Sequence, residues 1–240
     1  MYEATSTLRK PNYSLQPMWR YFPYERLREL LLNEELFFAH LPTFSDGLEG
    51  ELTARTNDHL FNWFVAQGSD FAMAQQELVQ YKNLQKQFYV SSWHMNNYES
   101  YLMWKAYGDR GFAVRTTFER MQASFDDFPG TITGGVVDYI DFEREKTSVG
   151  NVFNHVITKD KPYMDEREFR LVFWQPALKN QNILPGTGGI RVRINVKMLV
   201  ERVYTNPISK IDAAVLSELS ELLDLREIEF SSTLIKQRHR

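Results

Sequence analysis

The order of the apolar segments constrains the fold of this chain more than any other feature. Helical patterns come early, at 23–32 and at about 52–87, whereas short aromatic and β-branched segments crowd the remainder. The regular alternation of strands and helices that builds a parallel sheet is missing. The sequence therefore predicts an α+β fold with a mostly antiparallel sheet, split or bent around a cleft, with helices packed on it.

Local signals place the individual segments. Proline suits the first turn of the helix at 23–32, and Gly68 interrupts the long helical stretch. Asn97 and Asn206 are candidate caps for helices at 98–107 and 207–223. Strands are expected at 19–22, 36–39, 88–93, 111–115, 136–142, 169–174, 190–196, 200–204 and 227–230.

No repeat and no linker rich in Pro, Gly or Ser divides the chain. We expect an extended or frayed segment at 1–17, one α+β domain at 18–235, and a solvated basic tail at 236–240. Trp104 and Tyr107 share a helical face and are expected to pack in the core. The other expected core residues are Trp19, Phe37, Val90, Val114, Leu171 and Val196.

Composition excludes several classes of chemistry. The chain has no cysteine, which removes disulfides, thiolate zinc sites and a cysteine nucleophile and fits a reducing cytoplasm. A formal charge of −3 gives no overall nucleic-acid footprint. No apolar run approaches the roughly 18 residues that span a bilayer, and the first residues lack a secretory signal. The five histidines form no helical zinc pair. We therefore expect a cytoplasmic protein with no metal and no membrane partner.

The segment 163–174 carries the most informative charges. In an extended chain Glu166, Glu168 and Arg170 point to one side, which sets the two carboxylates about 7 Å apart. A solvated strand end carries such charges as well, and this interpretation stays open. The alternative is that both carboxylates belong to a site.

Two earlier strands contain residues that packing alone does not explain. Arg20 lies between Trp19 and Tyr21, where burial of its neighbours would hold the guanidinium beside a pocket. Ser91 and Ser92 interrupt an aromatic strand. An arginine, then a serine, then Glu-x-Glu on successive strands resembles the ordered pattern of one class of ADP-ribosyltransferases.

This resemblance implies that the substrate is NAD. Arg20, with Tyr21 beside it, would bind a phosphate of the dinucleotide, and Ser91 or Ser92 would fix the nicotinamide ribose. Glu168 would bind a ribose hydroxyl and stabilise the positive charge that develops as nicotinamide leaves. The accessory carboxylate, Glu166, would take a proton from the incoming nucleophile.

The chain also resembles a large bacterial family, domain-of-unknown-function family 2971, over roughly 18–235. The matching motifs are 19–22, 36–39, 44–50, 103–109 with Gly111, and 161–170. The family usually has Phe-Asn-Asp-Pro where this chain has Phe44-Ser45-Asp46-Gly47. A weaker similarity is to DNA-modifying ADP-ribosyltransferase toxins of bacterial toxin–antitoxin systems. It implies a toxin or phage-defence effector, a nucleic acid or protein acceptor, and an antitoxin or other partner protein.

Two other functions remain open at this point. A non-catalytic binding module would use an aromatic-lined groove, and Arg20 and Glu168 would then lie far apart or be held in ion pairs. A hydrolase or nuclease would use a metal bound by carboxylates such as Asp46, Glu49 or Glu168. The simpler expectation for Asp46 and Glu49 is a helix cap and a first-turn charge.

Overall fold

The structure is a computed structural model and describes residues 1–44, 48–108, 111–147, 150–175, 188–233 and 235. In these residues one nine-stranded sheet forms the centre of the molecule, and two further strands form a separate parallel pair. The strands of the main sheet are β1 (Pro17–Pro23), β2 (Glu35–His40), β3 (Phe88–Met95), β4 (Gly111–Thr117), β5 (Thr133–Val136), β8 (Glu168–Trp174), β9 (Gly189–Arg193), β10 (Arg202–Thr205) and β11 (Glu229–Ser231). The parallel pair is β6 (Asp138–Ile140) and β7 (Thr158–Asp160).

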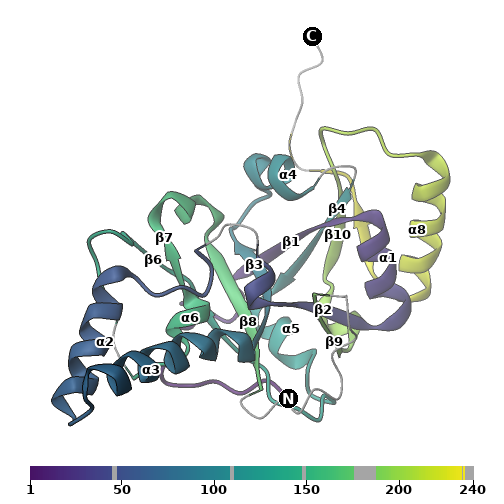
Figure 1. The fold of residues 1–240 in the computed structure, drawn as a ribbon. Helices are drawn as coiled ribbons and strands as arrows, with labels where there is room; N and C mark the ends of the chain where they lie inside the picture. Colours follow the sequence, from purple (N-terminus) through teal and green to yellow (C-terminus); the bar gives the residue numbers. More distant parts are fainter. Residues whose placement is uncertain (45–47, 109–110, 148–149, 176–187, 234, 236–240) are drawn as a thin grey trace.

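Helices flank the sheet on several sides (Figure 1). The α-helices are α1 (Tyr24–Asn33), α2 (Ala54–Ala66), α3 (Phe71–Lys82), α4 (Tyr101–Tyr107), α5 (Phe118–Ala123), α6 (Asn154–Ile157), α7 (Val196–Leu199) and α8 (Ala213–Leu225). Three short 3-10 helices are η1 (Leu41–Thr43), η2 (Asn83–Gln87) and η3 (Lys161–Glu166). Helices α1 and α8 pack at one end of the molecule, whereas α2 and α3 project from the other (Figure 1).

The strand order is β11-β10-β4-β1-β3-β2-β9, with β8 on the second edge of β3 and β5 beside β8. In the main sheet, as far as the structure describes it, the strand pairs are antiparallel except for β10 with β11. The prediction of a single α+β domain with a mostly antiparallel sheet is therefore confirmed.

The sheet splits along one edge of β3. The end of β3 near Met95 pairs with β1 through Met18 and Trp19. The other end of β3 pairs with β2 through Ala39 and His40. Since β1 and β2 share this edge, they separate beside the middle of β3, and we call this gap the split.

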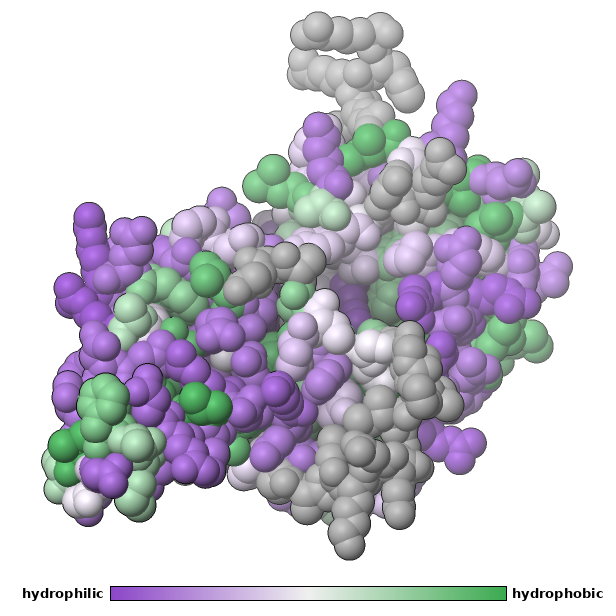
Figure 2. Space-filling model, viewed as in Figure 1, coloured by the Kyte–Doolittle hydropathy of each residue, from purple (hydrophilic) through white to green (hydrophobic). Residues whose placement is uncertain are grey.

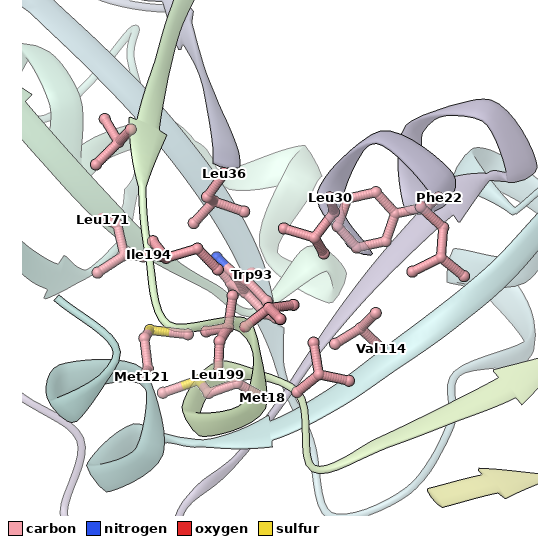
Figure 3. Packing of buried hydrophobic residues seen from close by; sticks show 14 of the residues in the cluster. Met18, Phe22, Leu30, Leu36, Trp93, Val114, Met121, Leu171, Ile194 and Leu199 are labelled. Atoms are coloured by element: carbon pink, nitrogen blue, oxygen red, sulfur yellow. The ribbon is translucent and has the colours of Figure 1, made fainter. Parts of the chain in front are cut away.

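The largest core cluster lies on one face of the sheet (Figure 3). Met18 and Phe22 of β1 point into it together with Trp93 of β3, and each is at most 6% exposed. Leu30 of α1 and Met121 of α5 close the cluster from the helices. Because successive side chains of a strand alternate between faces, Trp19 and Tyr21 point the other way, against Trp104 of α4.

Most of the expected core is buried. Trp19, Val90, Val114, Leu171 and Val196 are each at most 1% exposed, as is Trp104. Phe37 and Tyr107 contradict the prediction. Phe37 is only partly buried and lies under the guanidinium of Arg26 at 5.2 Å, and Tyr107 is 50% exposed.

Two expected helix caps are wrong because other side chains make the capping bonds. Helix α4 begins at Tyr101, since the Ser100 side chain accepts from the Met103 N–H. Helix α8 begins at Ala213, where Asp212 is the cap. The Asn206 side chain instead accepts from backbone N–H groups in the turn that precedes this helix.

Two expected strands also end differently. The segment 136–142 is not one strand, because β5 ends at Val136 and β6 begins at Asp138 in the other sheet. Val196 lies in α7, whose cap is Asn195, rather than in the strand before it. The N-terminal segment lies against β5, where Glu3 N–H donates to the Ile132 carbonyl and Leu8 is 4% exposed.

The α2–α3 hairpin carries exposed apolar side chains. Figure 2 shows a hydrophobic patch at the end of this projection, at the lower left. Trp63, Phe71 and Met73 are 47%, 70% and 54% exposed. Phe71 contacts the Phe61 ring and Trp63 contacts the Phe64 ring, both within the hairpin.

Candidate active site

A cavity of about 590 Å³ opens at the split. Strands β1, β2, β3 and β8 form its wall together with α4, β7 and η3. Its charged and hydrogen-bonding side chains include Arg20, Ser92, His94, Tyr107, Lys159, Glu166 and Glu168. Its rings include Trp19, Tyr21, Phe37, Phe44, Trp93 and Tyr163. Of the predicted site residues, only Ser91 does not line this cavity.

Arg20 reaches the cavity through the split. Its position in β1 alternates with Trp19 and Tyr21, so the side chain leaves the strand on the face of the main core. The guanidinium then lies in the gap, where it donates to Ser91 Oγ of β3 and to the Phe37 carbonyl of β2 at 3.3–3.4 Å. Arg20 therefore bridges both sides of the split while also bordering the cavity.

Arg20 is partly buried, and the groups around its charge are neutral. Its hydrogen-bond acceptors are a hydroxyl and a carbonyl, and the rings of Phe22 and Trp93 lie 5.1 and 5.8 Å from its central carbon. No carboxylate pairs with it in the part of the chain that the structure describes. Burial, with a smaller effect from the charge of Arg26, lowers the pKa of Arg20 to about 10. It is still a cation at neutral pH.

The two serines have different surroundings. Ser91 is fully buried and its hydroxyl accepts from Arg20 and from Trp93 Nε1, so it supports Arg20 from behind. Ser92 faces the cavity, and its hydroxyl is buried without a hydrogen-bond partner among the described residues. Tyr21 also lines the cavity, and its hydroxyl accepts from the Ser100 N–H.

A buried ion cluster lies at the opposite wall, on the other side of β3 from the split, and its members Lys159, Glu166 and Glu168 line the cavity. Arg170 is 0% exposed and makes a bidentate pair with Glu49 at 2.6 and 2.8 Å. It also donates to both oxygens of Glu168, at 2.8 and 3.1 Å. Lys159 lies 3.1 Å from Glu49, 2.6 Å from Glu166 and 2.9 Å from Glu168. We call these five residues the ion cluster.

Glu168 lines the cavity, but cations hold both of its oxygens. Burial alone would raise the pKa of Glu168, but Arg170 and Lys159 hold this pKa well below its ordinary value. Its backbone N–H donates to the Tyr139 hydroxyl at 2.8 Å. Since both of its oxygens already accept from cations, Glu168 could reach a substrate only by giving up one of these bonds.

Glu166 is less constrained. The left-handed backbone of Arg167, with φ of 42°, separates it from β8, so the expected extended Glu-x-Glu geometry is wrong at this residue. One Glu166 oxygen accepts from the Tyr107 hydroxyl at 2.8 Å and the other from Lys159. Burial and the neighbouring Glu168 carboxylate raise the pKa of Glu166. Its side chain is 18% exposed, against 6% for Glu168.

The ion cluster as a whole is negative. Three carboxylates oppose the two cations Lys159 and Arg170, which leaves one negative charge in excess when all five are ionised. The cavity therefore has a cation at the split and a net anion at the opposite wall. Such a site suits a ligand that carries both charges.

His94 lies between these walls on β3. It is 3% exposed, and its Nδ1 is 2.6 Å from the Glu166 carbonyl. Its Nε2 is buried and has no hydrogen-bond partner among the described residues. Burial lowers the pKa of His94, an effect that the Arg167 charge reinforces.

The sequence analysis missed several residues of this site. Lys159, Arg170, His94 and Tyr107 were not assigned to it, although Arg170 lies two residues after Glu168 and shares its face. The expectation that Glu49 is a first-turn helix charge is wrong, because Glu49 accepts a bidentate bond from Arg170 inside the protein. The sequence offered no local signal for the others, since they lie on separate elements.

Some predictions fall outside the described residues. These are the cap role of Asp46, the Ser45 position of the family motif, and the basic tail 236–240. Across the described ranges no group of three or more His, Asp or Glu side chains is arranged to hold a metal ion. Among the same residues no helix is long and apolar enough to cross a membrane.

Comparisons with known proteins provide no independent assignment. The chain matches no protein-family model, and neither the curated proteins nor the solved structures contain a significant match to it. Both family resemblances stay predictions, and the function must be argued from the cavity.

Proposed function

We propose that the chain is an NAD-dependent ADP-ribosyltransferase-like enzyme that binds NAD in the cavity at the split. The observation that carries this proposal is that one cavity is lined both by Arg20, at the split, and by the Glu166 carboxylate, next to β8 on the other side of β3. NAD has the matching charges, because its pyrophosphate is anionic and its nicotinamide ring is cationic. Both residues belong to the set that the sequence singled out.

Arg20 is suited to the phosphate end. A partly buried guanidinium whose partners are neutral retains its full charge for an anion, and it can bind phosphate through two parallel bonds. The Phe22 and Trp93 rings beside it lower the local polarity, which strengthens the attraction. This argument supports the proposal that Arg20 contributes to NAD affinity.

The negative wall is suited to the reacting end. When the bond between ribose and nicotinamide breaks, positive charge moves onto the ribose, and a nearby carboxylate stabilises it. We assign this role to Glu166 instead of Glu168, because Glu166 is more exposed and one of its partners is a neutral hydroxyl. Glu168 then acts as a positioning residue that holds Lys159 and Arg170.

The test is NAD binding by calorimetry and nicotinamide release by the purified protein, with cell extract as a source of acceptors. Glu166→Gln should bind NAD almost normally but release nicotinamide about 100-fold more slowly, since an amide cannot stabilise the developing charge. Glu221→Gln, an exposed change on α8, is the matched control and should behave as wild type. Equal rates in wild type and Glu166→Gln would remove this carboxylate from the mechanism.

A second function has one observation in its favour. The ion pairs that hold Glu168 are also what a non-catalytic nucleotide-binding module would show. NAD binding without nicotinamide release under every condition would favour this module. Failure to bind NAD would exclude both functions for this cavity.

A further inference from the structure

His94 has a hydrogen-bonding pattern that fixes its chemical form. Its Nδ1 lies 2.6 Å from the Glu166 carbonyl oxygen, and a carbonyl can only accept. The proton must therefore be on Nδ1, and in the neutral ring Nε2 carries a lone pair. That nitrogen has no partner among the described residues, although the ring borders the cavity.

Among the described residues, the other bases at this wall of the cavity are carboxylates that already accept hydrogen bonds. The Glu166 oxygens accept from Tyr107 and Lys159, and the Glu168 oxygens accept from Lys159 and Arg170. Proton uptake by either carboxylate would weaken an existing bond. Proton uptake at Nε2 breaks nothing and gives a buried nitrogen the hydrogen that it lacks.

We propose that His94 is the general base of the transfer reaction, with Nε2 as the atom that accepts the proton; this rests on the proposed function. A water molecule or an acceptor hydroxyl attacks C1′ of the nicotinamide ribose. The bond from C1′ to the nicotinamide nitrogen breaks, and its electron pair neutralises the pyridinium charge. The proton of the nucleophile passes to Nε2, so that atoms and charge balance.

The surroundings of His94 support this role. Its ring is anchored by the backbone of the same residue that supplies the stabilising carboxylate, so base and carboxylate are held together. Burial, assisted by the charge of Arg167, lowers the pKa of His94, which keeps Nε2 unprotonated at neutral pH. The residues that act on its pKa are Glu166 through its backbone and Arg167 and Glu168 through their charges. The other charged and titratable groups that line the same cavity are Arg20, Tyr21, Tyr107, Lys159 and Tyr163.

The protein contains a matched control. His155 is also buried, its Nδ1 lies 2.7 Å from the Gly50 carbonyl, and its Nε2 is unpartnered in the described chain. It does not line the cavity. The two histidines therefore share burial and backbone anchoring, and they differ in that only His94 lines the cavity.

The variants are His94→Asn and His155→Asn. Asparagine places an amide N–H near the position of Nδ1–H and so retains the bond to the backbone carbonyl, but it has nothing at Nε2. His94→Asn should bind NAD within about threefold of wild type and release nicotinamide at least 100-fold more slowly. His155→Asn should leave both values unchanged, and thermal unfolding of both variants checks their folding.

Two further measurements separate a base from a structural residue. The rate of nicotinamide release by the wild type should fall at a pH below the ordinary histidine pKa, where Nε2 becomes protonated. The residual rate of His94→Asn should not show this decrease with falling pH. Nitrogen-15 NMR should show the Nδ1–H form of His94 in the free protein. The Nε2–H form would overturn the inference whatever the activity is.

The outcomes distinguish this inference from the proposed function. Wild-type turnover with an equally active His94→Asn variant would overturn the base assignment and leave the transferase function standing. Absence of NAD binding or of nicotinamide release in the wild type would overturn the transferase function, and the base assignment with it.

Discussion

The cations at the two ends of the cavity differ in the groups that compensate their charge. At the split, the Arg20 guanidinium is surrounded by a hydroxyl, a carbonyl and aromatic rings. At the opposite wall, Arg170 and Lys159 are each held by two or more carboxylates. A charge compensated inside the protein contributes mainly to the native structure. A charge with neutral partners remains available for a ligand.

The same difference determines at which end the removal of a charged side chain lowers folding stability most. Removal of one member of a buried ion cluster leaves its partners charged and unpaired, which is strongly unfavourable. Removal of an uncompensated cation relieves a desolvation cost, at the expense of a few hydrogen bonds. The predictions below test this contrast, first in folding stability and then in ligand binding.

The largest effect is expected for Arg170→Met. This change keeps the apolar stem but leaves Glu49 and Glu168 with only Lys159 as a cation, and should lower the free energy of unfolding by about 3–5 kcal/mol. Urea denaturation measures it. Arg28→Met is the control, because it breaks an exposed pair with Glu218 and should change stability little. A similar small loss in both variants would show that the ion cluster does not hold the fold.

A smaller effect, in a different measurement, is expected for Arg20→Met. NAD binding should weaken about 10- to 100-fold, the usual cost of losing a charge-assisted hydrogen bond to phosphate. The loss of unfolding free energy should be well below that of Arg170→Met, since no carboxylate is left unpaired in the described chain. Calorimetry and urea denaturation on the same samples give both values. If Arg20→Met instead unfolds the protein and binding is unaffected in the folded fraction, Arg20 only closes the split.

The smallest effect concerns pH. Because burial and Glu168 raise the pKa of Glu166, the folded protein binds this proton more tightly than the unfolded chain does. The contribution of Glu166 to stability therefore rises as pH falls through the folded pKa towards the ordinary Glu value of about 4.3. The pKa values of His94 and His155 are lowered by burial, so these residues act in the opposite direction below about pH 6.5. The unfolding free energies of wild type and Glu166→Gln are measured across this pH range. Their difference gives the contribution of the Glu166 carboxyl group to stability.

Below about pH 4.3 the pH dependence has the opposite sign, because the ion cluster loses stability as pH falls. Burial opposes ionisation of Glu49, but Arg170 and Lys159 keep its pKa low, as they do for Glu168. Their stabilisation is present above the unfolded carboxyl range and is lost as pH falls through the folded values. Stability that is flat from pH 5 to 3 would contradict this account of the cluster.

Much of the fold follows from local sequence. The helix at Tyr24–Asn33 and the strands around Trp19, Phe38 and Val90 agree with their periodicity and their aromatic or β-branched content. Such signals depend only on neighbours in the chain. The first residues of α4 and α8 were harder to predict, because Ser100 and Asp212 compete with nearby asparagines that have the same capping chemistry.

The sequence by itself therefore determined the fold class and proposed Arg20, Ser92, Glu166 and Glu168 as members of one site. Only the tertiary structure decided what those residues do there. The pairing of β3 with both β1 and β2 opens the split that admits Arg20 to the cavity. The packing of the β7 segment beside β8 brings Lys159 to Glu168, and the loop before α2 brings Glu49 to Arg170. These contacts join residues far apart in the chain, so their charges meet only when the sheet has formed, and no local pattern encodes which of them remains free for a ligand.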